Sequence, residues 1–133
     1  MIENQKTIKV MLIEDNSGDA RLLQEYLKEA TVGEYKDIFV DVRWFNLLST
    51  GQQYLSVGSY DVVLLDMYLP DCKELECIEG IRAIAPHIPI IVLSGTVDEE
   101  IMAVAISKGA KAFISKNKCT ASMLLENIIR VVK

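Results

Sequence analysis

Residues 60–70 read YDVVLLDMYLP, and this stretch decides the class of fold. Residues 62–65 are apolar without interruption, whereas a strand exposed on one face alternates apolar and polar side chains. Such a run is typical of a strand buried on both faces, as in a parallel sheet covered by helices on each side. The run ends at Asp66, so an ionisable side chain lies at the carboxyl end of a buried strand.

Short apolar runs alternate with helical periodicity from this stretch to both ends of the chain. The pattern predicts strands at residues 6–14, 39–45, 61–66, 89–93 and 112–115, and helices at residues 16–30, 46–57, 75–85, 98–108 and 120–132. Crossovers between parallel strands are right-handed, which leaves few topologies. We expect an α/β fold with a doubly wound, flavodoxin-like (βα)5 sheet of five parallel strands in the order 2-1-3-4-5, as in other doubly wound proteins.

Three positions are expected to set the ends of helices. Asn16 or Ser17 can cap the first predicted helix, because short polar side chains accept hydrogen bonds from the free N–H groups there. Thr120 can cap the last helix in the same way. Gly109 is a suitable end for the fourth helix, since glycine adopts the left-handed conformation that closes many helices.

Composition and charge exclude several classes of protein. Of the 133 residues, 50% are hydrophobic and 25% are charged, which is the balance of one folded domain and not of a disordered chain. The net charge of −5 is opposite to that of a protein that binds nucleic acid through its phosphates. No apolar run approaches the ~20 residues that cross a bilayer, and residues 1–7 lack the apolar core of a secretion signal. We therefore expect a cytoplasmic protein that binds neither membrane nor nucleic acid.

The cysteine and histidine content argues against disulfide and zinc chemistry. Cys72, Cys77 and Cys119 are an odd number of cysteines in a chain without a secretion signal, so we expect reduced structural thiols. His87 is the single histidine, and a zinc site needs about four ligands at closer spacing. The same scarcity disfavours a Ser-His or Cys-His hydrolase.

Polar and charged side chains stand where four of the predicted strands end. They are Glu14 and Asp15 after the first strand, Asp66 at the third, Ser94 at the fourth and Lys116 at the fifth. The carboxyl ends of parallel strands share one edge, and strands 1 and 3 are neighbours in the expected order, so the three acids should meet in one cleft. Two like charges ~4 Å apart cost about 4 kcal/mol at an effective dielectric of ~20. Because oxygen ligands alone suit Mg²⁺, we predict a divalent-cation site, with Mn²⁺ as the alternative ion.

Four stretches resemble the receiver domain of two-component response regulators. They are VMLIEDNSGDARLL at residues 10–23, YDVVLLDMYLP at 60–70, IIVLSG at 90–95 and GAKAFISK at 109–116. The similarity covers essentially the whole chain, with the motifs in order. It implies that residues 1–133 form a single stand-alone receiver domain with no output domain.

The resemblance implies a metal site built around the phospho-acceptor. Asp66 would accept the phosphoryl group, and it would also ligate the metal. Asp15 would bind Mg²⁺ directly, and Glu14 would act mainly through a metal-bound water. The backbone carbonyl of Tyr68 would complete the protein ligands.

The resemblance also implies roles for three residues around the phosphoryl group. Ser94 would donate a hydrogen bond to one phosphoryl oxygen, and Lys116 would pair with another. Phe113 would hold the aromatic switch position, filling space that opens when Ser94 moves. The donor would be a phosphohistidine of a sensor histidine kinase or phosphotransfer protein, and the changed surface would bind an unknown downstream protein.

The predicted function is a phospho-accepting signalling switch that does not work as a multiple-turnover enzyme. One alternative is a degenerate receiver that only binds partners. Another is an aspartyl-nucleophile phosphatase, which usually carries a second acid two residues after the nucleophile, where this chain has Tyr68. A flavin or nucleotide module would need a neutral phosphate loop after the first strand, whereas residues 14–19 read EDNSGD.

Two readings of residues 98–132 stay open. Residues 101–106 are apolar all round a helix, and the last helix is broadly apolar too. These two helices and the sheet could form one tightly packed interface of small residues. Alternatively, they leave an exposed patch for an output partner or for a homodimer through the 98–132 surface.

Three departures from the family pattern put local geometry in question. Asn117 stands where the family usually has a proline with a cis bond after the lysine. Glu74 stands where a glycine is common, so the loop before the third helix can take another path. Tyr68 is bulky beside the expected phosphoryl site, and we expect it to restrict water and to slow loss of the phosphoryl group.

Overall fold

The structure, a computed structural model, describes residues 6–33, 35–73, 75–96 and 98–132. Its elements are β1 (Lys6–Ile13), α1 (Ser17–Val32), β2 (Ile38–Phe45), α2 (Leu48–Val57), β3 (Val62–Asp66), α3 (Glu76–Ile84), β4 (Ile90–Ser94), α4 (Glu99–Ser107), β5 (Ala112–Ser115), a 3₁₀ helix (Lys116–Lys118) and α5 (Ala121–Val132). The strands form one parallel sheet in the order β2-β1-β3-β4-β5. The predicted fold is confirmed, and every predicted element is present with ends shifted by at most two residues.

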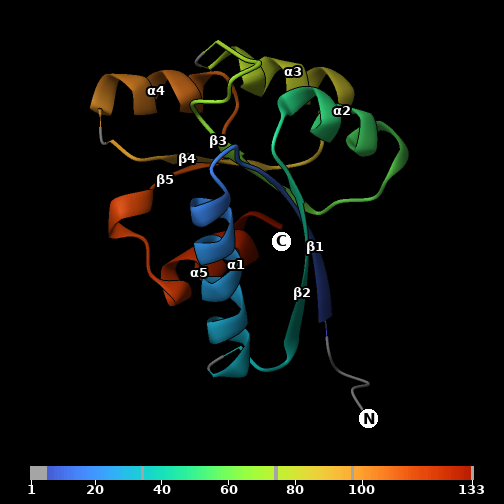
Figure 1. Cartoon of the computed structure of the whole chain (residues 1–133), viewed down its shortest axis with the longest axis vertical. Coiled ribbons are helices and arrows are strands. Elements are labelled where there is room, and N and C mark those ends of the chain that lie inside the picture. The colour runs from blue at the N-terminus through green and yellow to red at the C-terminus, as the bar shows by residue number, and fades with distance from the viewer. Residues whose placement is uncertain (1–5, 34, 74, 97, 133) are drawn as a thin grey trace.

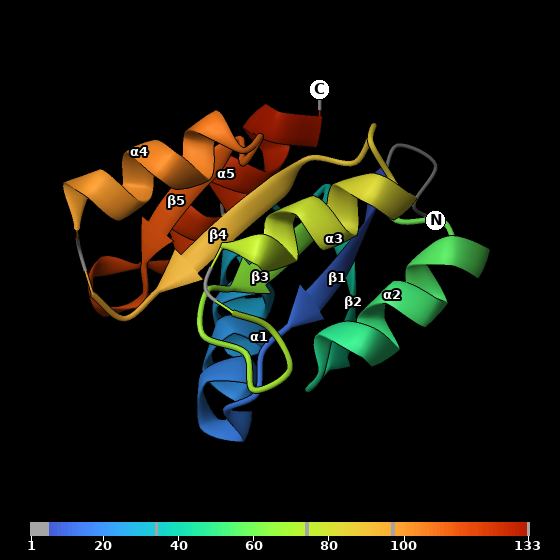
Figure 2. The same cartoon turned by 90° about the horizontal axis from the view of Figure 1, so that it is seen from above.

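The helices cover the sheet in two layers. α1 and α5 lie on one face, and α2, α3 and α4 lie on the other (Figures 1 and 2). The side chains of β1 alternate between the two cores: Val10 and Leu12 pack on the α1 and α5 side, and Met11 and Ile13 pack on the other. Every residue of β3 and β4 is buried, which is why these strands carry uninterrupted apolar runs.

The predicted helix ends are confirmed. The side chain of Asn16 accepts a hydrogen bond from the backbone N–H of Asp19 at 2.9 Å, and the Thr120 hydroxyl accepts one from the N–H three residues on at 3.1 Å. Gly109, just after α4, has a φ of +115°, a conformation that side-chain-bearing residues rarely adopt. A Cβ at this position would also collide with the guanidinium of Arg82, which donates to the carbonyl of Lys108 at 2.9 Å.

Of the two readings left open for residues 98–132, the structure does not support the one in which the fourth and fifth helices pack together. α4 and α5 lie on opposite faces of the sheet, on either side of β5 (Figure 1). Ala105 is the buried residue of α4, whereas Val104 and Ile106 are 44% and 46% exposed. In α5, by contrast, Leu124, Leu125 and Ile128 are fully buried. Most of the exposed apolar surface of this region therefore lies on α4. The structure therefore favours the alternative of an exposed apolar patch.

Helix α2 begins at a cap that comes from a distant loop. Leu47 at its N-cap position makes no side-chain cap hydrogen bond. Instead, the two carboxylate oxygens of Asp71 accept from the N–H groups of Leu48 and Ser49, each at 2.9 Å. This contact ties the segment that follows Asp66 to the start of α2.

Replacing Asp71 with alanine should lower the free energy of unfolding by about 1 kcal/mol, the usual cost of losing a helix cap. Burial raises the pKa of Asp71, but the hydrogen bonds from Ser49 and Leu48 outweigh this effect and lower the pKa overall. Its stabilising contribution is therefore complete at neutral pH and is lost as the pH falls through the lowered value. Urea unfolding of Asp71→Ala against Asp37→Ala, which alters an exposed side chain, measures the difference. Equal stability of the two variants would contradict the capping role.

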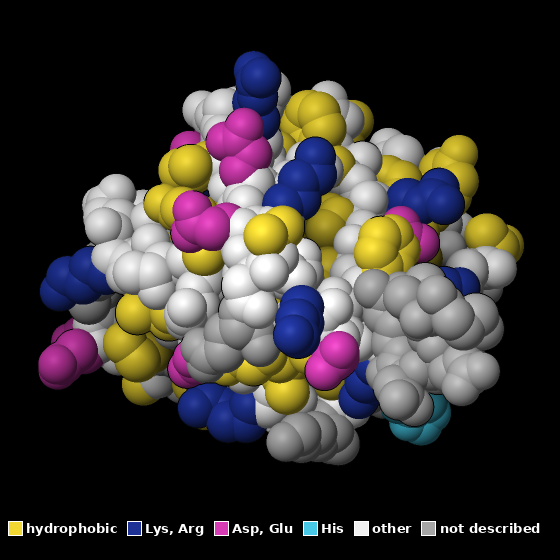
Figure 3. All heavy atoms as spheres, turned by 90° about the horizontal axis from the view of Figure 1, so that it is seen from below, with side chains coloured by type: hydrophobic (Ala, Val, Ile, Leu, Met, Phe, Trp, Pro, Cys, Tyr) yellow, Lys and Arg dark blue, Asp and Glu magenta, His cyan; other side chains and the backbone are white. Residues whose placement is uncertain are grey.

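The surface mixes apolar and charged side chains. On the face shown in Figure 3, basic and acidic side chains are interspersed with hydrophobic ones. Cys72, Cys77 and Cys119 form no disulfide bond with one another, in agreement with the prediction of reduced thiols. Across the part of the chain that the structure describes, no helix is long and apolar enough to cross a membrane.

Candidate functional site

The strand ends converge on one cleft of about 390 Å³. Glu14 and Asp15 follow β1 and Asp66 ends β3, which pairs with β1 in parallel. Lys116 begins the 3₁₀ helix after β5 and reaches the same cleft. The structure therefore brings Glu14, Asp15, Asp66 and Lys116 together, whereas at the end of β4 Gly95 and not Ser94 lines the cleft.

The three acids form a compact cluster. One carboxylate oxygen from each of Glu14, Asp15 and Asp66 lies within 4.8 Å of the other two. Glu14 and Asp66 are buried, and Asp15 is exposed to solvent. Such a cluster of like charges is unfavourable unless a proton or a cation is held there.

Lys116 lies among three carboxylates. Its Nζ is 2.5 Å from Oε1 of Glu14, 3.2 Å from Oδ1 of Asp66 and 3.1 Å from Oδ2 of Asp19. Asp19 lies in the first turn of α1, and its contact with Lys116 is not predicted from the sequence. The available signal was its place one helical turn after the acidic pair, which turns it toward the strand ends.

The clustered charges shift the pKa values of the site. Burial and the neighbouring Asp66 carboxylate raise the pKa of Glu14 to about 7, against the opposing effect of Lys116. Burial and Asp66 also raise the pKa of Asp15. Burial alone would lower the pKa of Lys116, but Glu14, Asp66 and Asp19 outweigh this and raise it, so the ammonium stays charged. The site therefore holds one fixed cation and favours one further proton near neutral pH.

Metal-free protein should lose stability as the pH rises from about 4.5 to about 7, and the loss should level off above pH 7. The folded pKa of Glu14, about 7, lies above its ordinary value of 4.5, so the folded chain binds this proton more tightly than the unfolded chain does. The stabilisation that accompanies the proton is therefore lost between these two pH values. Replacing Glu14 with glutamine should remove this dependence and raise the stability at about pH 8 by about 1 kcal/mol or more. Thermal unfolding in a chelator measures both effects.

Glu126→Gln is the matched control for that measurement, because it makes the same change on the exposed side of α5. It should keep the slope of the wild-type protein. Adding Mg²⁺ should stabilise the wild type more at high pH than at low pH, since the cation competes with the proton. A pH-independent stability of the metal-free wild type between these values would contradict the prediction.

The residues present fit a divalent metal ion. Oε1 of Glu14 is fully buried and has no well-oriented hydrogen-bond partner among the described residues, although the ammonium lies nearby. The other donors in the cluster are carboxylate oxygens, which hard cations such as Mg²⁺ prefer. The acidic cleft is thus suited to a cation in addition to Lys116.

Ser94 ends β4 and Phe113 lies in β5, and the side chain of each contacts other parts of the protein. Ser94 is fully buried, and its hydroxyl donates to the carbonyl of Thr96 at 2.8 Å. Phe113 is half-buried and packs against the core beneath α2, α3 and α4. For the predicted roles, the Ser94 hydroxyl must exchange this bond within its loop for one to a phosphoryl oxygen.

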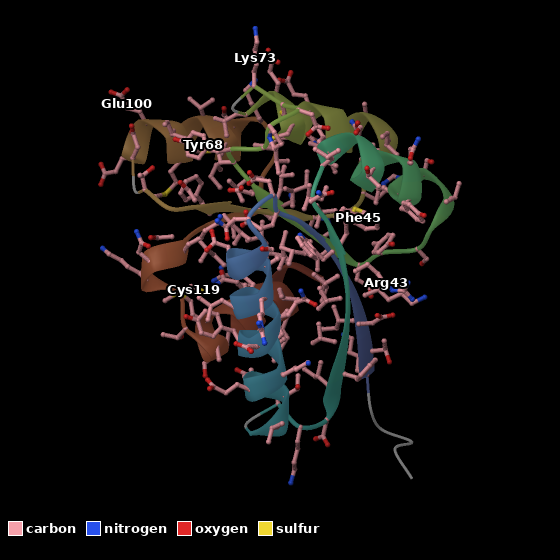
Figure 4. The ribbon with its side chains drawn as sticks, in the orientation of Figure 1. Arg43, Phe45, Tyr68, Lys73, Glu100 and Cys119 are labelled. Atoms are coloured by element: carbon pink, nitrogen blue, oxygen red, sulfur yellow. The ribbon has the colours of Figure 1, made fainter. Side chains whose placement is uncertain are left out.

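Tyr68 stands at the mouth of the cleft. The residue is 52% exposed, and it lies near the carboxyl end of β3 (Figure 4). Its backbone N–H lies 3.5 Å from Oδ1 of Asp66. Tyr68 therefore lines the same cleft as the buried acid.

The structure shows the geometry at Asn117, which stands where the family usually has a proline with a cis bond. The described residues contain no cis peptide bond, so the bond from Lys116 to Asn117 is trans. The Asn117 amide donates to the carbonyl of Gly95 at 2.6 Å, which ties the loop after β5 to the loop after β4. Glu74, the other departure in a loop, lies outside the described residues.

The fold and the acidic cleft define a class of protein, and comparison of the sequence with known protein families identifies that class. The family model for the response regulator receiver domain matches residues 10–129. The chain belongs to this family, whose members are signalling switches of two-component systems and generally not multiple-turnover enzymes. Receiver domains bind a divalent metal at an acidic pocket, the kind of pocket formed by Glu14, Asp15 and Asp66.

Curated relatives are response regulators of greater length. The chain is 34% identical over 73 residues to the swarming motility regulation protein RssB of Serratia marcescens, covering 55% of the chain and 33% of RssB. It is 27% identical over 114 residues to the cell cycle transcriptional regulator CtrA of Caulobacter vibrioides, covering 82% of the chain and 44% of CtrA. The chain thus spans less than half the length of these relatives.

Solved receiver structures share the fold. A CheY-like receiver domain protein from Methanospirillum hungatei superposes with a TM-score of 0.79 at 20% identity, covering 96% of this chain and 94% of that one. A putative response regulator from Chloroflexus aurantiacus gives a TM-score of 0.81 at 17% identity, covering 96% and 98%. At these identities the likeness establishes the fold alone.

Proposed function

We propose that this receiver domain accepts a phosphoryl group on Asp66 from the phosphohistidine of a sensor histidine kinase or phosphotransfer protein. The observation that carries the proposal is the position of Asp66, which is buried between the acidic pair and the ammonium of Lys116, 3.2 Å away. A carboxylate nucleophile needs no general base, because it is already ionised. The site supplies positioning and countercharge, which phosphoryl transfer chiefly requires.

The transfer step conserves atoms and charge. A carboxylate oxygen of Asp66 forms the new bond to phosphorus as the N–P bond of the phosphohistidine breaks. The electron pair of that bond returns to the imidazole, which takes up a proton from solvent. Lys116 holds its charge near the equatorial oxygens of the phosphoryl group throughout.

The metal of this site is proposed to be Mg²⁺, with Mn²⁺ as the alternative. Asp15 and Asp66 would hold it directly, Glu14 through a bound water, and Tyr68 through its backbone carbonyl. When bound, the ion supplies positive charge for the phosphoryl oxygens. The raised pKa values of Glu14 and Asp15 support a site that is incomplete without a cation.

Ser94 and Phe113 are proposed to convert phosphorylation into a surface change. The Ser94 hydroxyl would leave the Thr96 carbonyl for a phosphoryl oxygen, drawing the loop after β4 inward. Asn117 would transmit this movement, because its amide holds Gly95 of the same loop. Phe113, half-buried on β5 next to β4, would then turn inward.

The output surface is proposed to lie on α4, β5 and α5. Val104 and Ile106 of α4 and Met123 of α5 are exposed apolar side chains of this region. They suit an unknown downstream protein or a second copy of the chain. Light scattering before and after phosphorylation distinguishes the two, since only the second changes the mass of the isolated protein.

The decisive experiment incubates the whole chain with Mg²⁺ and acetyl phosphate, and follows the intact mass. The expected result is a single acid-labile phosphoryl group that appears only with a divalent metal. Release of phosphate from a phosphoester over many turnovers would indicate the aspartyl phosphatase instead. The absence of any labelling would indicate a degenerate receiver that only binds partners.

Replacing Tyr68 with asparagine should shorten the lifetime of the phosphoryl group several-fold. The exposed ring borders the cleft, and its removal gives water a wider approach to Asp66. Phosphate loss is timed by intact mass after the donor is removed. Tyr68→Phe keeps the bulk and should leave the lifetime unchanged. An unchanged or longer lifetime of Tyr68→Asn would contradict the role of the ring.

A further inference from the structure

Without a phosphoryl group on Asp66, the ammonium of Lys116 already lies close to three carboxylates. An ammonium has three N–H donors, and the Nζ of Lys116 lies within ion-pair distance of Glu14, Asp66 and Asp19. The contact with Asp19, at 3.1 Å, also has the geometry of a hydrogen bond. A phosphoryl oxygen that pairs with Lys116 therefore competes with these carboxylates for the ammonium, and most directly with Asp19, whose contact is the hydrogen-bonded one.

The three carboxylates differ in how much free energy it costs to separate each of them from Lys116. Glu14 is fully buried, so its carboxylate has no access to solvent if the ammonium leaves. Asp66 is the proposed acceptor and remains beside Lys116 when phosphorylated. The side chain of Asp19, in contrast, is 44% exposed, so water can replace the ammonium there. Of the three carboxylates, Asp19 is therefore the one whose separation from Lys116 costs the least free energy.

We propose that Asp19 is a positioning residue that occupies one N–H of Lys116 before phosphorylation and competes with the phosphoryl oxygen for it. The inference rests on the proposed function, because it assigns the phosphoryl group to Asp66. Asp19 pairs with the lysine on the open side of the cleft, while Glu14 holds it on the buried side. Glu14 and Asp66 remain within ion-pair distance of Lys116 when Asp19 is released, and Asp19 sets how readily the ammonium transfers to the phosphoryl group.

Asp19→Asn removes the competing charge with little change in shape. The backbone N–H of Asp19, which bonds to the Asn16 side chain, is retained. Glu25→Gln is the matched control, since it makes the same charge change on α1 in a side chain that is 60% exposed and pairs with Arg21. Asp19→Glu tests whether a carboxylate at this position restores the behaviour of the wild type.

Trp44 provides a readout that does not depend on turnover. It is the single tryptophan, and its indole N–H donates to the backbone carbonyl of Glu14 at 2.7 Å. Its fluorescence can therefore follow binding in the cleft. Titrations with Mg²⁺ alone, and with the phosphoryl analogue beryllofluoride at saturating Mg²⁺, give two separate affinities.

Asp19→Asn should bind beryllofluoride about two- to fivefold more tightly than the wild type, the change expected from losing one half-exposed ion pair. Its phosphorylation should reach half-maximal rate at a correspondingly lower acetyl phosphate concentration, with a similar maximal rate. Its Mg²⁺ affinity should stay within about threefold of the wild type, because Asp19 lies outside the carboxylate cluster. Glu25→Gln and Asp19→Glu should match the wild type in all three measurements.

Three results would overturn the inference. The first is an Asp19→Asn variant that matches Glu25→Gln, and the second is weaker beryllofluoride binding by Asp19→Asn. The third is a loss of Mg²⁺ affinity of about tenfold or more, which would make Asp19 a metal ligand. If the wild-type protein neither binds beryllofluoride nor takes up phosphate, the proposed function itself is wrong. This result differs from the three above, which contradict only the role of Asp19.

Discussion

Asp66→Asn is expected to take up no phosphate under conditions in which the wild-type chain is fully labelled. The amide is a poor nucleophile, and no other carboxylate of the cluster has the same surroundings. Asp66 is buried and lies at the end of the central strand β3, facing Lys116 at 3.2 Å. Asp15 is exposed, and burial and Asp66 raise the pKa of Glu14 to about 7, so this carboxyl group is only partly ionised near neutral pH in the metal-free protein. Intact mass after treatment with acetyl phosphate and Mg²⁺ is the measurement.

Two controls separate loss of the acceptor from loss of the fold. Asp37→Asn makes the same change at an exposed position and should label like the wild type. Asp66→Asn itself should remain folded, because the Asp66 carboxylate raises the pKa values of Glu14 and Asp15 and its removal relieves that repulsion. Retention of a stoichiometric phosphoryl group by a folded Asp66→Asn protein would disprove the assignment of the acceptor.

Lys116→Met should lower the initial rate of labelling about 100- to 1000-fold, the usual cost of removing one preorganised charge partner of a transition state. The ammonium is held in the cleft by Glu14, Asp66 and Asp19, so it needs little rearrangement to meet the charge that develops on the phosphoryl oxygens. Methionine keeps the length of the side chain and removes the charge. Initial rates by intact mass at saturating Mg²⁺ give the comparison.

Lys118→Met is the matched control, because it removes a lysine charge from the exposed end of the same 3₁₀ helix. It should label at the wild-type rate. Lys116→Arg retains the charge with a larger head group and should keep part of the activity. A rate for Lys116→Met within threefold of the wild type would show that the lysine has no part in the transfer.

The sequence predicts this fold well because its signals are local. The runs in β3 and β4 require burial on both faces, and that requirement selects a parallel sheet covered by helices. Caps such as Asn16 and the left-handed Gly109 act within one turn of chain, so they are visible in the sequence. The acidic cluster also follows from the sequence, because parallel strands bring their carboxyl ends to one edge.

Only the tertiary structure decided the contacts between residues that lie far apart in the sequence. Asp19 meets Lys116 across 97 positions, and Asp71 caps α2 from 23 positions away. The placement of α4 and α5 on opposite faces of the sheet, and the bond from Asn117 to Gly95, belong to the same group. Periodicity determines which face of an element is buried, but the path of a loop and the reach of a rotamer depend on the packed neighbours of the folded chain. The sequence by itself thus determined the sheet and the gathering of acids, and the packing determined which partners hold Lys116.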